Sequence, residues 1–395
     1  MEYNFDVVRS RKGMNAGKWE VLEVSKWKDH DFVPFSVADM DLVTPQPLID
    51  AMVERAAMGM YGYTPATGEY FDAIVNWMDR RHGWKVDPAW ITPLCGVVNG
   101  IYEAVKAFTQ PGDNIIIQPP VYFPFKAAVL DCGRTLVENP LKIEDGRYVM
   151  DFADLEEKAK TAKMIIVCNP HNPVGRVWSR EELTRLGEIC LRNGVKVVID
   201  EIHGDLINPD YELCAFGTLA PELANNAVIC TSASKSFSIP GLNTASIIIP
   251  NEDLRNGFRG MAYGTDGLHF QNTFGTTATI AAYNKCEDWM DQACAYIKGN
   301  YEAFRDFMAS HFPSVKVDPL EGTYLVWFDC NSLGLEPKEL EKFMVDECGI
   351  YMDEGYMFGP AGEGFERMNL ACPRHYIIEA LERMYAKAVE KGLPL

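Results

Sequence analysis

The stretch VKVVIDEIH, residues 195–203, decides the fold class of this chain. Its β-branched run ends abruptly at Asp200 and Glu201, a pattern typical of a buried strand that stops at a polar edge. Between about residues 45 and 290 such runs alternate with longer amphipathic stretches, which predicts an α/β fold: a mainly parallel sheet sandwiched by helices. The other strands predicted in this way are Asn114 to Gln118, Lys163 to Asn169, Ala227 to Thr231 and Thr244 to Ile249.

The pattern changes after about residue 290, where a smaller α+β domain is expected. A length of 395 residues also favours two or more domains. We expect an N-terminal segment over residues 1–44 that joins the small domain, a large domain over 45–289 and a small domain over 290–395. The small-domain elements predicted are a long helix through Asn300, a strand at Thr323 to Asp329, and helices near Pro337 to Glu347 and His375 to Lys391.

Two helix starts carry capping signals. Ser179 and Glu182 form an S-x-x-E capping box, which predicts a helix that stops at Asn193 and Gly194. A second helix is expected to begin with the Thr44 hydroxyl as its cap and Pro45 in its first turn.

Composition excludes several classes of protein. A net charge of -19 disfavours binding to nucleic acid or to anionic membranes. The eleven cysteines form no C-x-x-C pair and the seven histidines show no H-x-x-x-H spacing, so neither a disulfide framework nor a metal site is expected. No secretory leader or membrane-spanning run is recognisable, which favours a cytoplasmic location.

Polar residues follow three of the predicted strands. They are the turn NPHNPVG at residues 169–175, Asp200 to His203, and Ser232 to Lys235. Ligands of open α/β sheets bind beyond the carboxyl ends of the strands, so we expect these residues to form one site.

Lys235 is the candidate nucleophile of that site. A lysine among small serines after an apolar strand can lose water and become reactive, although a solvated surface lysine has the same local pattern. Asp200 ends a run too apolar for an unpaired carboxylate, so it requires a cationic partner such as a protonated pyridine nitrogen. Asn172, between two prolines, could direct its amide at a ring hydroxyl or could serve only as a turn residue.

A phosphate group would complete a ligand of this kind. Hydroxyls of Ser232 and Ser234 can bind it, together with backbone N–H groups where Gly96, Val97 and Val98 open a helix through Phe108. These features together predict that pyridoxal 5′-phosphate (PLP) is bound covalently to Lys235.

The chain resembles the class I/II aminotransferase superfamily of PLP enzymes, the fold type I group, over nearly its whole length. It is most similar to the MalY/PatB-like cystathionine β-lyase, or cysteine-S-conjugate β-lyase, branch. The stretches that carry this resemblance are Val37 to Asp41, Asp200 to His203, Ser232 to Leu242 and Arg367 to Arg374.

The resemblance implies further roles for individual residues. Tyr122 would stack on the cofactor ring, and Tyr63 would reach the cofactor phosphate of a neighbouring subunit, so a homodimer with shared active sites is expected. Arg374 would bind the substrate α-carboxylate, with the backbone of Ala38 and Asp39 completing that pocket.

Two positions depart from the usual aminotransferase pattern. His203 stands where a tyrosine is common, and it would either donate to the ring oxygen or be a satisfied buried histidine. Asn243 stands where a phosphate-binding arginine is common, which puts the phosphate affinity in doubt. Both substitutions recur in the β-lyase branch.

The resemblance therefore implies α,β-elimination of L-cystathionine or another cysteine thioether to a thiol, pyruvate and ammonia. Two alternatives stay open: a class I/II aminotransferase, and a regulatory MalY-like protein with secondary lyase activity.

Overall fold

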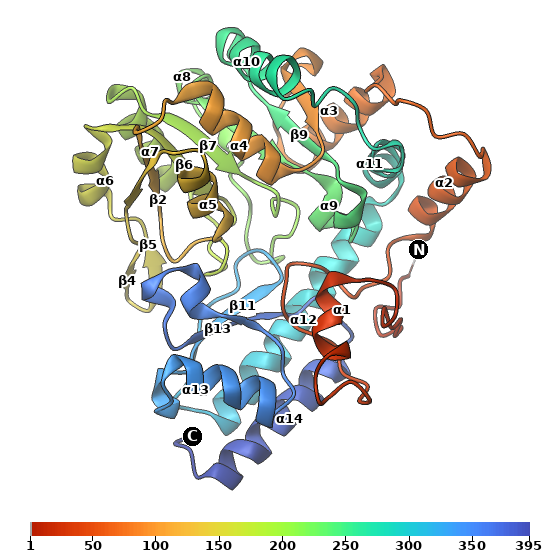
Figure 1. The fold of residues 1–395 in the computed structure, drawn as a ribbon, viewed down its shortest axis with the longest axis vertical. Coiled ribbons are helices and arrows are strands. Elements are labelled where there is room, and N and C mark those ends of the chain that lie inside the picture. Colours follow the sequence, from red (N-terminus) through yellow and green to blue (C-terminus); the bar gives the residue numbers. More distant parts are fainter. Residues whose placement is uncertain (1) are drawn as a thin grey trace.

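The computed structural model describes residues 2–395, which form two bodies, each built on one sheet and linked by a long helix (Figure 1). Seven strands form the large sheet in the order β1-β9-β8-β7-β6-β2-β3. Strands β3, β2, β6, β7 and β8 run parallel, whereas β9 is antiparallel to both of its neighbours. The α/β class expected from the sequence is therefore confirmed. The strands are β1 (Ile91–Leu94), β2 (Asn114–Ile117), β3 (Thr135–Glu138), β6 (Ala162–Cys168), β7 (Lys196–Asp200), β8 (Ala227–Thr231) and β9 (Ala245–Ile248).

Both faces of the large sheet are buried, which explains why its strands are apolar throughout. In β6, Ile165 and Val167 pack into one hydrophobic core, while Met164 and Ile166 pack into a second core on the opposite face. The second core is covered by α4 (Val97–Phe108), α5 (Pro124–Asp131) and α10 (Glu252–Arg259). The first is covered by α3 (Gly68–His82), α6 (Phe152–Ala159), α7 (Arg180–Arg192) and α11 (Thr273–Lys285).

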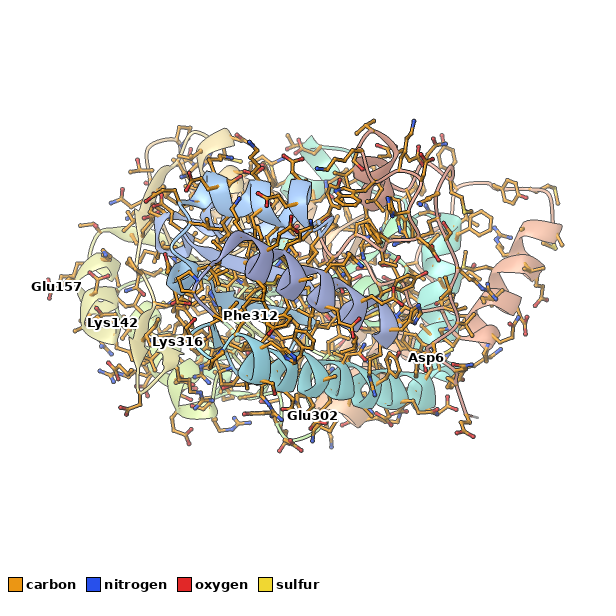
Figure 2. The ribbon with its side chains drawn as sticks, turned by 90° about the horizontal axis from the view of Figure 1, so that it is seen from below. Asp6, Lys142, Glu157, Glu302, Phe312 and Lys316 are labelled. Carbon is orange, nitrogen blue, oxygen red and sulfur yellow. The ribbon has the colours of Figure 1, made fainter. Side chains whose placement is uncertain are left out.

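Helix α12 (Glu287–His311) runs from the large body into the small one, where four antiparallel strands lie in the order β10-β11-β13-β12. Figure 2 views the molecule from this end and shows α12 lying beside α14 (Arg374–Lys391), with Phe312 just beyond the end of α12. The strands are β10 (Lys316–Val317), β11 (Leu325–Asp329), β12 (Asp353–Glu354) and β13 (Phe365–Asn369), and α13 spans Pro337–Lys342.

The N-terminal segment lies against the small body. The indole of Trp27 donates to the Val345 carbonyl at 2.9 Å, and the Phe35 amide donates to the Tyr351 carbonyl at 2.7 Å. One short helix, α1 (Gly17–Glu23), interrupts the segment. The exact limits at residues 44 and 290 stay predictions of the sequence.

The two capping predictions have opposite outcomes. The box at the start of α7 is confirmed, because Ser179 Oγ accepts from the Glu182 amide at 3.2 Å and the Glu182 carboxylate accepts from the Ser179 amide at 2.8 Å. The Thr44 cap is wrong, because the Thr44 hydroxyl instead donates to the Phe237 carbonyl at 2.7 Å. Helix α2 (Gln46–Ala57) accordingly begins after Pro45 without a side-chain cap.

Short or edge elements escaped the sequence analysis. Strand β1 contains Pro93, which cannot donate to a neighbouring strand, and β3 spans four residues with no fully buried side chain. The sequence also did not predict the hairpin of β4 (Lys142–Glu144) and β5 (Arg147–Val149), the strands β10, β12 and β13, or the short helices α8 (Pro221–Ala224) and α9 (Ala233–Ser236). None of the helices within residues 2–395 combines the length and apolar character that crossing a bilayer requires.

Candidate active site

A cavity of about 220 Å³ lies beyond the carboxyl ends of β6, β7 and β8. It brings together residues from distant parts of the chain, because parallel strands end at one edge of the sheet. Of the predicted site residues it contacts Ala38, Gly96, Val97, Val98, Tyr122, Asn172, Asp200, His203, Ser234 and Lys235, and it also contacts Asn243.

Lys235 lies on the one-turn helix α9 that directly follows β8. Its Nζ donates to the Ala38 carbonyl oxygen at 2.5 Å. Burial lowers the pKa of this amine from 10.5 to about 8, helped by the positive charge of Arg367 and opposed by Asp39 and Asp200. The amine is thus neutral over a larger part of the physiological pH range than an ordinary lysine, as a nucleophile or base requires.

Asp200 ends β7 inside the cavity. Burial raises the pKa of its carboxyl group to about 7, although the Ile202 amide, which donates to Oδ1 at 3.0 Å, and the charge of Lys235 both lower it. Its second carboxylate oxygen has no hydrogen-bond partner within residues 2–395. A buried carboxylate with one unpaired oxygen favours a cationic ligand group, because such a group would offset the cost of removing the carboxylate from water.

Asn172 lies in the turn after β6, and its side chain reaches across to the small sheet. Its Oδ1 accepts from Nη1 of Arg367 in β13 at 2.8 Å. The guanidinium also forms an ion pair with Asp353, and its Nε is buried without a partner. Arg367 is therefore a buried cation beside the cavity with one donor still unused.

The structure does not bring Arg374, the predicted ligand of the substrate carboxylate, to the cavity. Arg374 is the first residue of α14, its Nε donates to Asn300 Oδ1 at 2.9 Å, and its guanidinium lies over the ring of Tyr296. Arg367, seven residues earlier, does not line the cavity itself, but it bonds to Asn172, which does, and its charge lowers the pKa of Lys235. Arg367 is 2% exposed, and an arginine buried so deeply requires a buried partner or an anionic ligand.

One end of the cavity suits a phosphate group. Gly96, Val97 and Val98 contact it where the twelve-residue helix α4 begins, and the first amides of a helix have no partner within that helix. Ser234 also contacts this cavity, and so does Asn243, which has a left-handed backbone with φ of 48°.

Ser232 does not contact the cavity. Its hydroxyl donates to the Thr244 carbonyl at 2.6 Å and accepts from the Ser234 amide at 3.0 Å. These two bonds make Ser232 the cap of α9, so its predicted phosphate contact is not supported by the structure.

Two rings line the remaining walls. Burial and the nearby charge of Asp200 raise the pKa of Tyr122 to about 12, so the phenol keeps its proton. Burial, together with Lys235 and Arg367, holds the pKa of His203 well below its usual range, so the imidazole is neutral. His203 Nδ1 is buried without a hydrogen-bond partner, and the predicted donation to a cofactor oxygen would satisfy it.

Two other predicted residues lie outside the cavity. Tyr63 is 85% exposed and stacks on Phe270, with 4.6 Å between ring centroids. The Asp39 carboxylate pairs with Arg11 and its amide donates to the Val37 carbonyl, so of residues 38 and 39 only Ala38 borders the cavity.

These residues fit PLP. The cavity offers an amine for the aldehyde, an unsatisfied carboxylate for a protonated ring nitrogen, an orphaned imidazole nitrogen and a set of helix amides for a phosphate. Among residues 2–395 no three His, Cys, Asp or Glu side chains converge to hold a metal ion.

The fold and this cavity define fold type I of the PLP-dependent enzymes. The chain belongs to the aminotransferase class I and II family, whose model matches residues 30–384. It is 40% identical to cystathionine β-lyase PatB of Bacillus subtilis over 97% of this chain and 99% of that protein, and 30% identical to the protein MalY of Escherichia coli over 94% and 95%. The crystal structure of cystalysin from Treponema denticola, which contains PLP, superposes with a TM-score of 0.95 at 38% identity and covers 99% of this chain and 100% of that one.

The positions of Arg367 and Arg374 can be tested by the effect of each residue on the pKa of Lys235. We expect Arg367→Gln to raise the pKa of the Lys235 amine above about 8, because it removes a nearby positive charge, and Arg374→Gln to leave it unchanged. Acetylation of Lys235 in apoprotein across a pH series, read by peptide mass spectrometry, measures both. An equal shift in the two variants would contradict the placement of Arg367.

Proposed function

We propose that the chain is a PLP-dependent carbon–sulfur β-lyase that cleaves L-cystathionine or another cysteine S-conjugate to a thiol, pyruvate and ammonia. The observation that carries the proposal is the buried Lys235 amine in one cavity with the unsatisfied Asp200 carboxylate. Similarity to PatB over nearly the whole chain supports the lyase reaction in particular.

When bound, PLP supplies an electron sink for the electrons released as the substrate Cα–H bond breaks. Asp200 keeps the ring nitrogen protonated, Asn172 and His203 bind the ring oxygen, and Tyr122 covers the ring face. Gly96, Val97, Val98 and Ser234 bind the phosphate.

Lys235 carries out the proton chemistry of this chain. Its neutral amine takes the α-proton of the substrate and then delivers a proton to the departing sulfur. The enamine released from the site hydrolyses to pyruvate and ammonia. A pKa of about 8 suits both roles, since the amine can accept and return a proton near neutral pH.

Arg367 binds the substrate α-carboxylate in this proposal. Its unused Nε donor and its position between Asn172 and Asp353 allow it to orient the substrate over the cofactor. Ala38 forms the neighbouring wall.

The reaction itself is tested with purified holoenzyme, cystathionine and no keto acid. We expect equal amounts of thiol and pyruvate, and Lys235→Ala should abolish both. Amino transfer to an added keto acid, without thiol release, would instead identify an aminotransferase.

Carboxylate binding is tested by steady-state kinetics of two arginine variants. Arg367→Gln should raise KM at least about 30-fold, because the loss of a buried charged contact costs about 2 kcal/mol or more. Arg374→Gln, whose side chain contacts Asn300 outside the cavity, serves as the matched control and should change KM little. The reverse order would restore the original assignment to Arg374.

We also propose that two copies of this chain share their active sites. An exposed apolar surface surrounds Tyr63, where the loop after α2 meets residues 270–274. Its residues and exposed fractions are Val53 62%, Met58 57%, Met60 70%, Tyr61 57%, Tyr63 85% and Phe270 51%. In this proposal Tyr63 reaches the cofactor phosphate of the partner.

Subunit mixing tests the shared site. Lys235→Ala and Tyr63→Ala are each expected to be nearly inactive alone, and to regain activity after they are denatured and refolded together. Mixed dimers would contain one site with both residues intact. Absence of recovery, with dimers present by light scattering, would contradict the role of Tyr63.

A further inference from the structure

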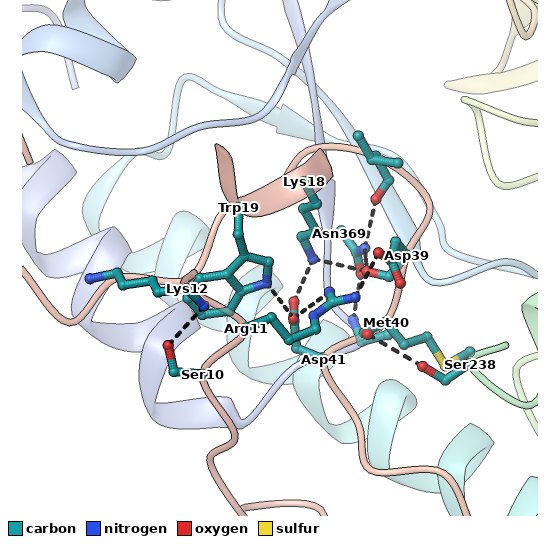
Figure 3. Close-up of polar contacts among 12 residues, drawn as sticks. Ser10, Arg11, Lys12, Lys18, Trp19, Asp39, Met40, Asp41, Ser238 and Asn369 are labelled. Carbon is teal, nitrogen blue, oxygen red and sulfur yellow. Dashed lines mark hydrogen bonds and ion pairs between the residues drawn. The ribbon is translucent and has the colours of Figure 1, made fainter. Parts of the chain in front are cut away.

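The backbone of residues 37–41 is fixed by side chains from several other segments (Figure 3). Each of its first four carbonyl oxygens accepts a hydrogen bond from a side chain. The donors are Asn369 to Val37 at 2.9 Å, Lys235 to Ala38 at 2.5 Å, Lys18 and Asn369 to Asp39 at 2.9 and 3.0 Å, and Ser238 to Met40 at 3.3 Å. The segment therefore joins the active-site lysine on one side to the N-terminal segment on the other.

Asp41 connects residues 37–41 to the N-terminal segment. Its side chain is 3% exposed and accepts from Lys18 Nζ at 2.5 Å, Arg11 Nη2 at 2.7 Å and the Trp19 indole at 3.1 Å. The Lys18 side chain is 1% exposed, so this is a fully buried ion pair. Such a pair is costly to desolvate and is strongly destabilised when one partner is removed.

The backbone conformation of this segment is one that the chain would not adopt unaided. Val37 has a φ of 58°, in the left-handed region that β-branched residues avoid, and its amide donates to Asp353 at 2.8 Å. A strained backbone of this kind persists only where surrounding contacts hold it. The conformation of Val37 in turn sets the direction of the Ala38 carbonyl.

We propose that Lys18 and Asp41 are positioning residues for the amine of Lys235. Their ion pair fixes the backbone of residues 37–41, and the Ala38 carbonyl then holds the amine whenever it is free of cofactor. The amine is free in the apoprotein and again while it acts as base, so the ion pair influences both cofactor capture and proton abstraction. The second effect rests on the proposed lyase function, whereas the first does not.

Cofactor capture is tested on apoprotein of Lys18→Met and Asp41→Asn. Condensation of the Lys235 amine with the PLP aldehyde, which releases one water, is followed by the visible absorbance that appears. We expect the rate to fall about 10-fold or more, because small displacements of a reacting group have large effects on rate. The amount of PLP finally bound should match that of wild type.

Proton abstraction is tested on the loaded enzyme with substrate deuterated at Cα. A misplaced base makes breakage of the C–H bond slower, so both variants should show a lower kcat and a larger deuterium isotope effect. Lys18→Arg, which keeps the charge, should recover most of the wild-type values.

Glu103→Gln is the matched control, since Glu103 is also buried and pairs with Lys106 at 2.5 Å but lies within α4. Thermal melts show which variants fold. The proposal is refuted if Lys18→Met and Asp41→Asn match Glu103→Gln in capture rate and isotope effect, with kcat reduced only in proportion to bound PLP.

Arg11→Gln, which removes the partly exposed cation alone, gives a milder test if both variants fail to fold. Loss of capture rate with no lyase reaction in wild type would support the positioning role and reject only the proposed function.

Discussion

The rest of the structure depends on a carboxylate and an amine buried in the same cavity. Asp200 and Lys235 are each forced by burial toward their neutral forms, with pKa values displaced toward each other to about 7 and about 8. Neither group would be tolerated in this position without neighbours that limit the cost of its charge. The surrounding elements supply those neighbours, which include the Ile202 amide for Asp200 and the Ala38 carbonyl for Lys235.

Left-handed backbone occurs at two non-glycine positions of the same cavity. Asn243, with φ of 48°, lines the cavity, and Val37, with φ of 58°, directly precedes the lining residue Ala38. Conformations of this kind cost about 1–3 kcal/mol each and are retained where the surrounding structure requires a particular geometry.

The sequence predicted the parts of the site that follow strands. Lys235, Asp200 and Asn172 each come directly after an apolar run, and parallel strands bring such positions together without any knowledge of side-chain packing. Position along the chain did not reveal which of two arginines bonds to a cavity residue, because that depends on the packing of β13 and α14: Arg367 bonds to Asn172 and Arg374 to Asn300. Ser232 shows a related ambiguity, since a serine before a helix can bind a ligand or cap the helix, and here it caps α9. The edge strand β1 was missed because Pro93 interrupts it, and the edge strand β3 because it has no fully buried side chain.

In the proposed function, the hydrogen bond between Asn172 and Arg367 connects substrate binding to the contact between the two bodies. Asn172 lies in the turn after β6 of the seven-stranded sheet and Arg367 lies in β13 of the four-stranded sheet, so this contact is one of those that join the two bodies. The carboxylate that Arg367 binds in the proposed function would therefore lie where the two bodies meet.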